Sequence, residues 1–371
     1  MNRPLQILRT AAVVLLSLGL ARAQNIIKFD APGAGTAAGQ GTLAEGIDPL
    51  GTTFGYYIDG SSVAHGFLRV WNGYFVTFTA PGAGTGAGQG TFAFSLNPEG
   101  TITGYYLDGN GAMHGYLRNF FGHFTTFDAP GAGNGPGQGT LSLNINPQGT
   151  VAGYDYDSSG VAHAFVRSRD GSFVTYEAAG AGTGAGQGTG TASGIGLNPE
   201  GAITGAYIDS NNTLHGYVRD PDGNITSIDP PGAGNGPGQG SDTDGLNFAG
   251  IISGIYVDSN NVLHGYVRAL DGTITEFDVP GAGTGAGQGT VPQGLNAEGA
   301  VTGSYADSNS VSHGFVRSPR GAITTFNAPG AGSSGGQGTF PLLNNPEGAI
   351  TGYQIDSGGV YHGFLRSPRG R

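Results

Sequence analysis

The sequence contains no cysteine, few lysines, a single tryptophan and no long apolar run. Without cysteine the chain can form no disulfide and carry no lipid on a thiol, so packing alone must stabilise it. No segment repeats its apolar residues at a period of about 3.6 over the length of a helix. These absences argue against a disulfide-rich small domain and against a helical protein.

The one apolar run, residues 11–20, is shorter than the ~20 residues that span a bilayer. Arg3 and Arg9 precede it, and Ala21-Arg22-Ala23 follows as a small-x-small cleavage site before Gln24. This order is typical of a secretory signal peptide, whereas a buried N-terminal helix is the alternative. We therefore predict a signal peptide at residues 1–23, no membrane span, and a product secreted to the periplasm or the extracellular space.

The charge of the chain limits its possible partners, and its glycine content raises the question whether it folds. The formal net charge of −11 at pH 7 becomes −14 once Arg3, Arg9 and Arg22 are removed with the signal peptide. An acidic surface with few lysines argues against nucleic acid and anionic membranes as partners. Glycine fills 74 of 371 positions, but 10% aromatic content and the regular placement of the glycines favour a packed structure over disorder.

A glycine-rich segment organises the chain. The sequence FDAPGAGNGPGQGT at residues 127–140 has seven related copies, spaced by 49 residues except for one step of 52. A fixed period of this length indicates a repeat architecture. The copies start at Phe29, Phe78, Phe127, Tyr176, Ile228, Phe277 and Phe326.

Each repeat predicts four short antiparallel strands. In the second repeat these are residues 91–97, 101–108, 114–120 and 123–130, rich in β-branched and aromatic residues. The Asn-Pro-Glu-Gly segment at residues 97–100 is a turn between the first two strands. Four strands in about 49 residues are typical of a β-propeller blade.

The two ends of the chain predict how the ring closes. The seventh copy stops after its third strand, while the segment QNIIKFDAPG at residues 24–33 matches the missing fourth strand. We therefore predict an all-β fold at residues 24–371, a single seven-bladed β-propeller of four-stranded blades closed by the N-terminal strand. A β-solenoid is the alternative, although it would need capping repeats.

Three polar residues recur in every copy at fixed spacing. In the second repeat Asp108 ends a strand, His114 follows six residues later, and Arg118 four after that. Seven Asp–His pairs could be catalytic or could bind metal. An enzyme needs one site rather than seven, so we predict a structural packing and hydrogen-bonding motif, with no catalytic and no metal-binding residue.

A specific register follows if Asp108 pairs with His114 across the hairpin. Tyr106 would then face Tyr116, and Arg118 would lie over Gly104, where a glycine leaves room for the arginine side chain. The arginines could also pair with the acids that follow the fourth-strand aromatic residue. Thr79 and Asn327 stand at that position in two copies, so such pairs cannot form in every repeat.

The glycine segments are the other candidate site. They should cross from one blade to the next on the face where the Asp-Ser-Asn-Asn turns open, either as compact loops with positive φ or as a surface for an extended polymer. Phosphate binding is a poor interpretation because no helix follows. A ring of glutamines near the inner strands is the predicted ligand-binding set: Gln40, Gln89, Gln138, Gln187, Gln239, Gln288 and Gln337.

Two acidic segments raise calcium as an alternative to a protein without cofactors. They are residues 220–224 and 242–245, but each is shorter than a complete calcium loop and occurs in one repeat. Other departures from the repeat are Trp71, His123 and Asp155, which replaces a tyrosine. The sequence does not place these departures in one pocket.

The recurring pattern N-x-x-G-x-(I/V)-x-G-x-Y…H-(G/A)-F-x-R resembles the HAF-type extracellular repeat of bacterial exported proteins. His163-Ala164-Phe165 is that tripeptide, and the other copies read His-Gly-Phe or His-Gly-Tyr. The resemblance implies an exported bacterial repeat protein and transfers no catalytic residue.

Three functions remain open at this point. The favoured one is a secreted, monomeric, non-enzymatic module that binds a glycan or cell-surface polymer through several weak sites. A coat or matrix protein is the first alternative and should self-associate. A propeller hydrolase or lyase is the second, and should gather non-repeated acids or histidines on one face.

Overall fold

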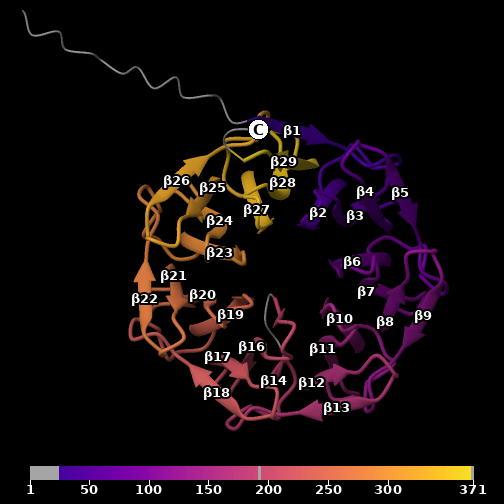
Figure 1. Ribbon diagram of the computed structural model, residues 1–371, viewed down its shortest axis with the longest axis horizontal. Helices are drawn as coiled ribbons and strands as arrows, with labels where there is room; N and C mark the ends of the chain where they lie inside the picture. Colours follow the sequence, from indigo (N-terminus) through magenta and orange to yellow (C-terminus); the bar gives the residue numbers. More distant parts are fainter. Residues whose placement is uncertain (1–24, 191–193, 369–371) are drawn as a thin grey trace, which may run out of the picture.

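The computed structural model describes residues 25–190 and 194–368. Within these residues the chain is all-β, contains no helix, and forms a closed, propeller-like ring of strands (Figure 1). It follows that the described part holds no helix long and apolar enough to cross a membrane. The predicted signal peptide at residues 1–23 lies outside the described residues.

Strands occupy four positions between the centre of the ring and its rim (Figure 1). The innermost are β2 (Gly41–Ile47), β6 (Gly90–Leu96), β10 (Gly139–Ile145), β14 (Gly188–Thr189), β15 (Gly196–Leu197), β19 (Gly240–Leu246), β23 (Gly289–Leu295) and β27 (Gly338–Asn344). Next are β3 (Thr53–Ile58), β7 (Ile102–Leu107), β11 (Val151–Tyr156), β16 (Ile203–Ile208), β20 (Ile252–Val257), β24 (Val301–Ala306) and β28 (Ile350–Ile355).

The outer two positions repeat in the same way. The third holds β4 (Ala64–Arg69), β8 (Met113–Arg118), β12 (Ala162–Arg167), β17 (Leu214–Arg219), β21 (Leu263–Arg268), β25 (Ser312–Arg317) and β29 (Tyr361–Arg366). The rim holds β1 (Ile26–Phe29), β5 (Phe75–Phe78), β9 (Phe124–Phe127), β13 (Phe173–Tyr176), β18 (Ile225–Ile228), β22 (Ile274–Phe277) and β26 (Ile323–Phe326).

Antiparallel pairing joins consecutive strands into groups, such as β6–β7–β8–β9. The predicted turn at Asn97 is confirmed, because the Gly100 amide donates to the Asn97 carbonyl over 2.9 Å. A parallel bridge between Met113 and Gly139 links this group to the next. We number the groups one to seven by their innermost strands, from β2 to β27. In the fourth group two short strands, β14 and β15, hold the innermost position.

The predicted closure of the ring by the N-terminal strand is confirmed. β1 pairs antiparallel with β29, with Ile26 opposite Arg366 and Phe29 opposite Gly363. Phe29 is buried, and its ring contacts Phe67 and Phe75 of the first group at centroid distances of 6.4 Å and 6.0 Å. The first strand of the chain therefore belongs to the last group and packs on the first.

Large aromatic side chains form the core of each group and its contact with the preceding one. One ring in each third strand is fully buried. The arginine that follows it reaches back to the preceding group, as Arg118 does over the Phe78 ring at 4.8 Å. The fully buried rings are Phe67, Tyr116, Phe165, Tyr217, Tyr266, Phe315 and Phe364.

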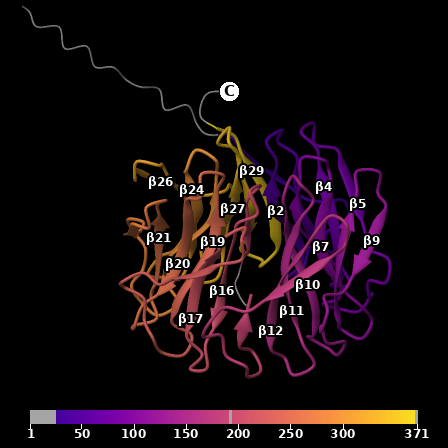
Figure 2. The same cartoon turned by 60° about the horizontal axis from the view of Figure 1, so that its bottom comes forward.

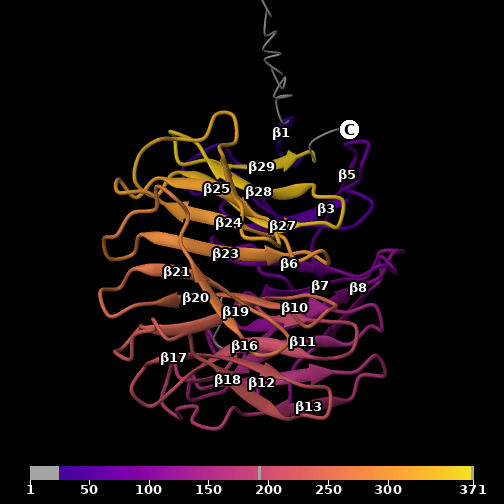
Figure 3. The ribbon, with the colours of Figure 1, turned by 60° about the vertical axis from the view of Figure 1, so that its left-hand side comes forward.

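The ring has two faces, which Figures 2 and 3 show from the side. On one face the glycine segments cross between groups, and we call it the glycine-loop face. The hairpin-turn face is the opposite one, where the first strand of a group turns into the second and the third into the fourth. The prediction that the Asp-Ser-Asn-Asn turns share the face of the glycine segments is confirmed, since the Gly88 amide donates to the Ser62 carbonyl over 2.8 Å.

Glycine is required where each crossing segment enters its inner strand. Gly90 has φ of +115°, and a Cβ there would lie 2.1 Å from the Ala64 carbonyl oxygen. The next residue, Thr91, is fully buried, and its hydroxyl accepts a 2.9 Å hydrogen bond from the Ala80 amide. Each crossing segment is thus fixed at both ends, by a backbone contact and by a buried hydroxyl.

We expect Thr91→Val to destabilise the protein by roughly 1–3 kcal/mol, because the buried Ala80 amide loses its acceptor. Equilibrium unfolding in urea would measure the change. Thr275→Val, at an exposed position of β22, is the matched control and should change the free energy of unfolding by less than about 0.5 kcal/mol. Equal effects of the two substitutions would contradict a structural role for the Thr91 hydroxyl.

Candidate binding site

The predicted glutamines lie within the crossing segments, directly before the inner strands. Gln89 accepts a 2.8 Å hydrogen bond from the Gly86 amide and donates a 3.1 Å bond to the Gly109 carbonyl. The other six glutamines accept the same loop hydrogen bond. Because both ends of the Gln89 amide are engaged, this side chain closes its own loop; contact with a ligand stays a prediction.

The recurring Asp, His and Arg residues occupy separate environments. Burial raises the pKa of Asp108, but hydrogen bonds from the Ala112 and Asn110 amides, together with His114, outweigh it and hold the pKa below the ordinary value. His114 Nε2 lies 3.8 Å from Asp108, while its Nδ1 contacts Asp128 at 2.8 Å. Asp108 therefore holds a turn, and His114 ties that turn to the end of the fourth strand.

Two details of the predicted register are wrong. Tyr106 faces His114 with stacked rings 5.0 Å apart, and Tyr116 faces Gly104. The pairing is shifted by two residues because Asp108 belongs to the turn and not to the strand. The suggested pairing of arginines with the following acids is also wrong for Arg118, because Asp128 contacts His114 while Arg118 lies over Phe78.

The acidic segments considered for calcium serve local structure. Asp220 accepts 2.8 Å hydrogen bonds from both the backbone and the side-chain amide of Asn224. Asp242 is buried within β19. Among the described residues no group of three or more histidines and acids has a geometry that could hold a metal ion.

Exposed aromatic side chains mark the hairpin-turn face of the first two groups. Trp71 and Tyr74 lie in the β4–β5 turn, and Phe120 and Phe121 in the β8–β9 turn, with exposed fractions between 67% and 82%. The corresponding turns elsewhere carry mainly charged and small residues, although Leu270 is also exposed. Of the five large exposed aromatic residues in the described part of the chain, four lie in this sector, and the fifth, Phe248, lies in the β19–β20 turn.

A hollow of about 580 Å³ lies beside these turns, between the first and second groups. We call it the aromatic-turn hollow. Leu50, Leu68 and Phe120 are among the apolar residues that line it, and Asp48 and Glu99 are among the polar ones. It thus combines an aromatic ring and an apolar floor with carboxylates.

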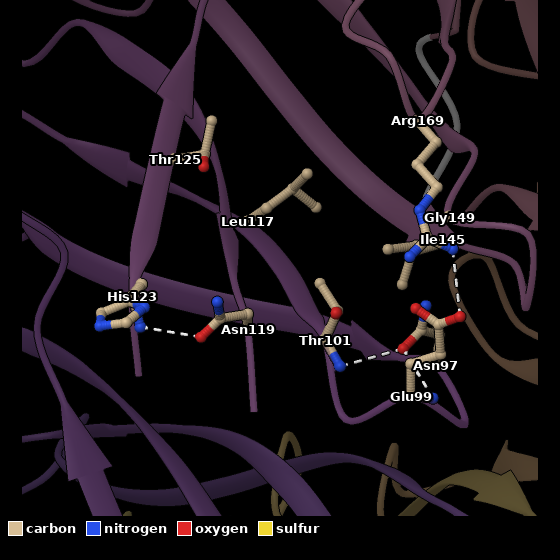
Figure 4. A pocket seen from close by; sticks show the side chains of 10 residues that line it. All are labelled: Asn97, Glu99, Thr101, Leu117, Asn119, His123, Thr125, Ile145, Gly149 and Arg169. Atoms are coloured by element: carbon tan, nitrogen blue, oxygen red, sulfur yellow. Dashed lines mark hydrogen bonds and ion pairs between the residues drawn. The ribbon is translucent and has the colours of Figure 1, made fainter. Parts of the chain in front are cut away.

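A smaller hollow of about 170 Å³ lies on the other side of the β6–β7 turn (Figure 4). We call it the His123 hollow. Glu99 and Arg169 form a 3.1 Å ion pair on one side of it, and His123 lies on the other side (Figure 4). Glu99 lines both hollows, so they form one sector that extends over the first three groups.

Sequence reasoning identified Trp71 and His123 as departures from the repeat but missed Phe120, Phe121 and Leu50. Comparing equivalent turn positions in all seven copies would have found them. Phe120 occupies the same place as Trp71 and Leu270, and Leu50 stands where the next two copies have Glu99 and Gln148. The hollows themselves could not be derived, because they depend on how neighbouring groups pack.

No protein-family model and no curated protein matches this sequence. Among solved structures, the chain is similar in fold to the BP39L lectin from Burkholderia pseudomallei, with 12% identity, a TM-score of 0.55, and coverage of 87% of this chain and 94% of that one. A second match is AofleA from Arthrobotrys oligospora, with 14% identity, a TM-score of 0.46, and coverage of 92% and 86%. A puromycin hydrolase mutant matches at 12% identity and a TM-score of 0.49, and this chain covers 53% of it. These similarities concern the fold, so the chemistry of the site rests on the residues of this chain.

Proposed function

We propose that the protein is an exported, non-enzymatic binding module that takes a glycan in the aromatic-turn hollow. The four-stranded groups are blades of a seven-bladed propeller of the HAF-type repeat class, and the molecule acts as a monomer. The observation that carries the proposal is the concentration of exposed aromatic rings in two neighbouring turns, one of which contributes Phe120 to the lining of the hollow.

Sugar chemistry suits this surface. One side of a pyranose ring presents C–H groups that stack on an aromatic face, while its hydroxyls need hydrogen-bond partners. Phe120 offers an aromatic face within the hollow, the exposed Trp71 follows the lining residue Val70, and Glu99 and Asp48 offer carboxylates as acceptors. Exposed aromatic patches on a protein that is otherwise rich in small polar residues mark interaction sites.

The similarity in fold to a lectin supports the same class of function. A sector spanning three groups would accommodate several sugar units, with the His123 hollow receiving the next unit along the chain. The Glu99–Arg169 pair would then orient hydroxyls at the junction of the two hollows.

Binding of residues 24–371 to a glycan array, followed by calorimetry with the best fragments, tests the proposal. A ligand that binds the folded state should also raise the unfolding midpoint with concentration. We expect Phe120→Ala to weaken the affinity about tenfold, which corresponds to about 1.4 kcal/mol. Leu270→Ala is the matched control, because Leu270 occupies the same turn position and is 70% exposed.

Three outcomes would overturn the proposal. Equal affinities for the Phe120→Ala and Leu270→Ala variants would place binding elsewhere. Shortening of the glycan fragments during incubation would indicate a hydrolase or lyase. Absence of binding together with concentration-dependent assembly in sedimentation would favour a coat or matrix protein.

A further inference from the structure

Two groups of the ring lack a contact that the other five share. In those five groups a tyrosine of the second strand stacks on the recurring histidine, with ring centroids 4.8 to 5.0 Å apart. In the seventh group Gln354 faces His362 instead, and its side-chain nitrogen lies 3.3 Å from where a Cβ of Gly330 would be. The third group has Asp155 in place of the tyrosine, facing His163 in the same register. The five stacked pairs are Tyr57–His65, Tyr106–His114, Tyr207–His215, Tyr256–His264 and Tyr305–His313.

A hollow of about 400 Å³ lies beside His163 on the glycine-loop side of this group. We call it the His163 hollow. Pro130, Gly131, Thr175 and Glu177 are among the residues that line it. It is separate from the aromatic-turn hollow, which lies on the opposite face.

Two lining residues show that the hollow occupies the place of the missing tyrosine ring. A Cβ on Gly82 would lie 3.2 Å from the Tyr106 hydroxyl, whereas a Cβ on the equivalent Gly131 would meet nothing within 4 Å. Thr175 corresponds to Ser227, whose hydroxyl lies 3.2 Å from the Tyr207 hydroxyl in the fourth group. The glycine and the hydroxyl that a tyrosine contacts elsewhere are therefore both uncovered in the third group.

His163 is the most exposed of the seven recurring histidines. Its side chain is 35% exposed, compared with 13% to 25% for the other six recurring histidines. Glu177 accepts a hydrogen bond at His163 Nδ1 and so fixes the plane of the ring. The imidazole face is thus held in place for a second ring.

Asp155 does not fill the space. Its carboxylate is fully buried, and neither oxygen has a hydrogen-bond partner among the described residues. Burial raises the pKa of Asp155 to about 7, with His163 acting in the opposite direction. A carboxyl group that can stay protonated leaves the neighbourhood compatible with an uncharged aromatic ligand.

We propose that the His163 hollow binds a small phenol, stacked on His163 with its hydroxyl at Thr175. The ligand would repeat the contacts that a tyrosine side chain makes in five other groups. A free phenolic compound and an exposed tyrosine of another protein share this chemistry. The site is independent of the glycan site, since the two share no residue.

The probe is 4-methylphenol, which is the tyrosine side chain without its backbone, and toluene is the control that lacks the hydroxyl. Titration of residues 24–371 followed by NMR of the histidine rings would report the site directly. We expect one 4-methylphenol per chain, a shift of the His163 ring signals, and at least tenfold weaker binding of toluene. A tyrosine-containing tripeptide, compared with the same peptide containing phenylalanine, distinguishes a protein partner from a free phenol.

Three variants test the site. Asp155→Tyr restores the residue of five other groups and should abolish binding, while Tyr106→Asp should open an equivalent hollow at His114 and raise the stoichiometry to two. Should Asp155→Tyr not fold, His163→Ala removes the stacking partner and should lose binding as well. The proposal is overturned if the wild type does not bind 4-methylphenol, or if the Asp155→Tyr or His163→Ala variant binds it as tightly as the wild type.

Discussion

A chain that lacks residues 24–30 is expected to lose its folded ring. These residues supply β1, whose removal would expose the whole edge of β29. The deletion also removes the buried ring of Phe29, over which Arg69 lies at 4.7 Å, and the 2.7 Å contact between Asp30 and His362. An unpaired edge strand next to an uncovered aromatic core is a site of aggregation. Circular dichroism and size-exclusion chromatography would detect the loss.

A rearranged chain separates the role of the strand from that of its position in the sequence. The last residues, Ser367-Pro368-Arg369-Gly370, match the turn sequence Ser318-Pro319-Arg320-Gly321 that precedes β26. Adding residues 25–30 after Gly370 of the truncated chain would place the strand after a turn of the same length, and we expect folding to return. Failure of the rearranged chain, or normal folding of the truncated one, would contradict closure by β1.

A single substitution gives a graded version of the same test. Phe29→Ala should cost about 3–5 kcal/mol, as expected for a large buried aromatic residue. Phe78→Ala is its counterpart at the end of β5, where the strand continues directly from its own group. If closure of the ring limits global unfolding, Phe29→Ala should accelerate unfolding more than Phe78→Ala does.

We expect the protein to be more stable at pH 5 than at pH 8. Burial raises the pKa of Asp155 and of Glu45 to about 7, from ordinary values of 3.8 and 4.5. The folded state keeps these protons up to about pH 7, whereas the unfolded state releases them near pH 4. Their stabilising contribution is therefore complete at low pH and is lost as the pH rises to 7, by on the order of 3 kcal/mol for Asp155.

Other titratable groups also shape the pH range in which the folded state is most stable. Burial disfavours the charged form of His163, but Glu177 outweighs it and raises the pKa of His163, so its contribution is also lost at higher pH. Hydrogen bonds from the turn, chiefly the Val161 amide, lower the pKa of Asp157, whose contribution is lost as the pH falls below its ordinary value of 3.8. The recurring aspartates thus favour folding above about pH 4, and the optimum lies near pH 5.

Guanidinium unfolding at pH 5 and pH 8 measures this difference. Asp155→Asn should raise the stability at pH 8 and reduce the difference between the two pH values, because it removes the buried titrating group. Asp157→Asn should lower the stability at pH 8, since it removes a carboxylate that accepts hydrogen bonds from the Ser159 and Val161 amides. A wild-type protein that gains stability from pH 5 to pH 8 would contradict the assignment.

The repeat made much of the fold predictable from the sequence. Strand positions, the turn at Asn97, the shared face of the loops and the closing strand follow from spacing and turn residues alone. The register around His114 did not follow, because a residue at a strand end can belong to the strand or to the turn. Asp108 holds the turn through two backbone amides, and this shifts the pairing by two residues.

The sites were less predictable than the fold. Asp155 could be recognised as a departure, but the open space beside His163 depends on residues of two neighbouring groups, such as Gly131 and Thr175. The aromatic-turn hollow likewise lies between groups. Comparison of equivalent positions finds the residues that differ, while the shape between them requires the packed ring.

The meeting of the two chain ends in one strand pair has a mechanical consequence. Ile26 lies opposite Arg366, and the Ser367 amide donates to the Asn25 carbonyl over 2.9 Å, so both ends leave from the same end of this pair. A force applied to the termini would therefore open the β1–β29 ladder one rung at a time, as a zipper opens, instead of shearing all its hydrogen bonds together. We therefore expect a pull on the termini to open the ring first at the β1–β29 pair.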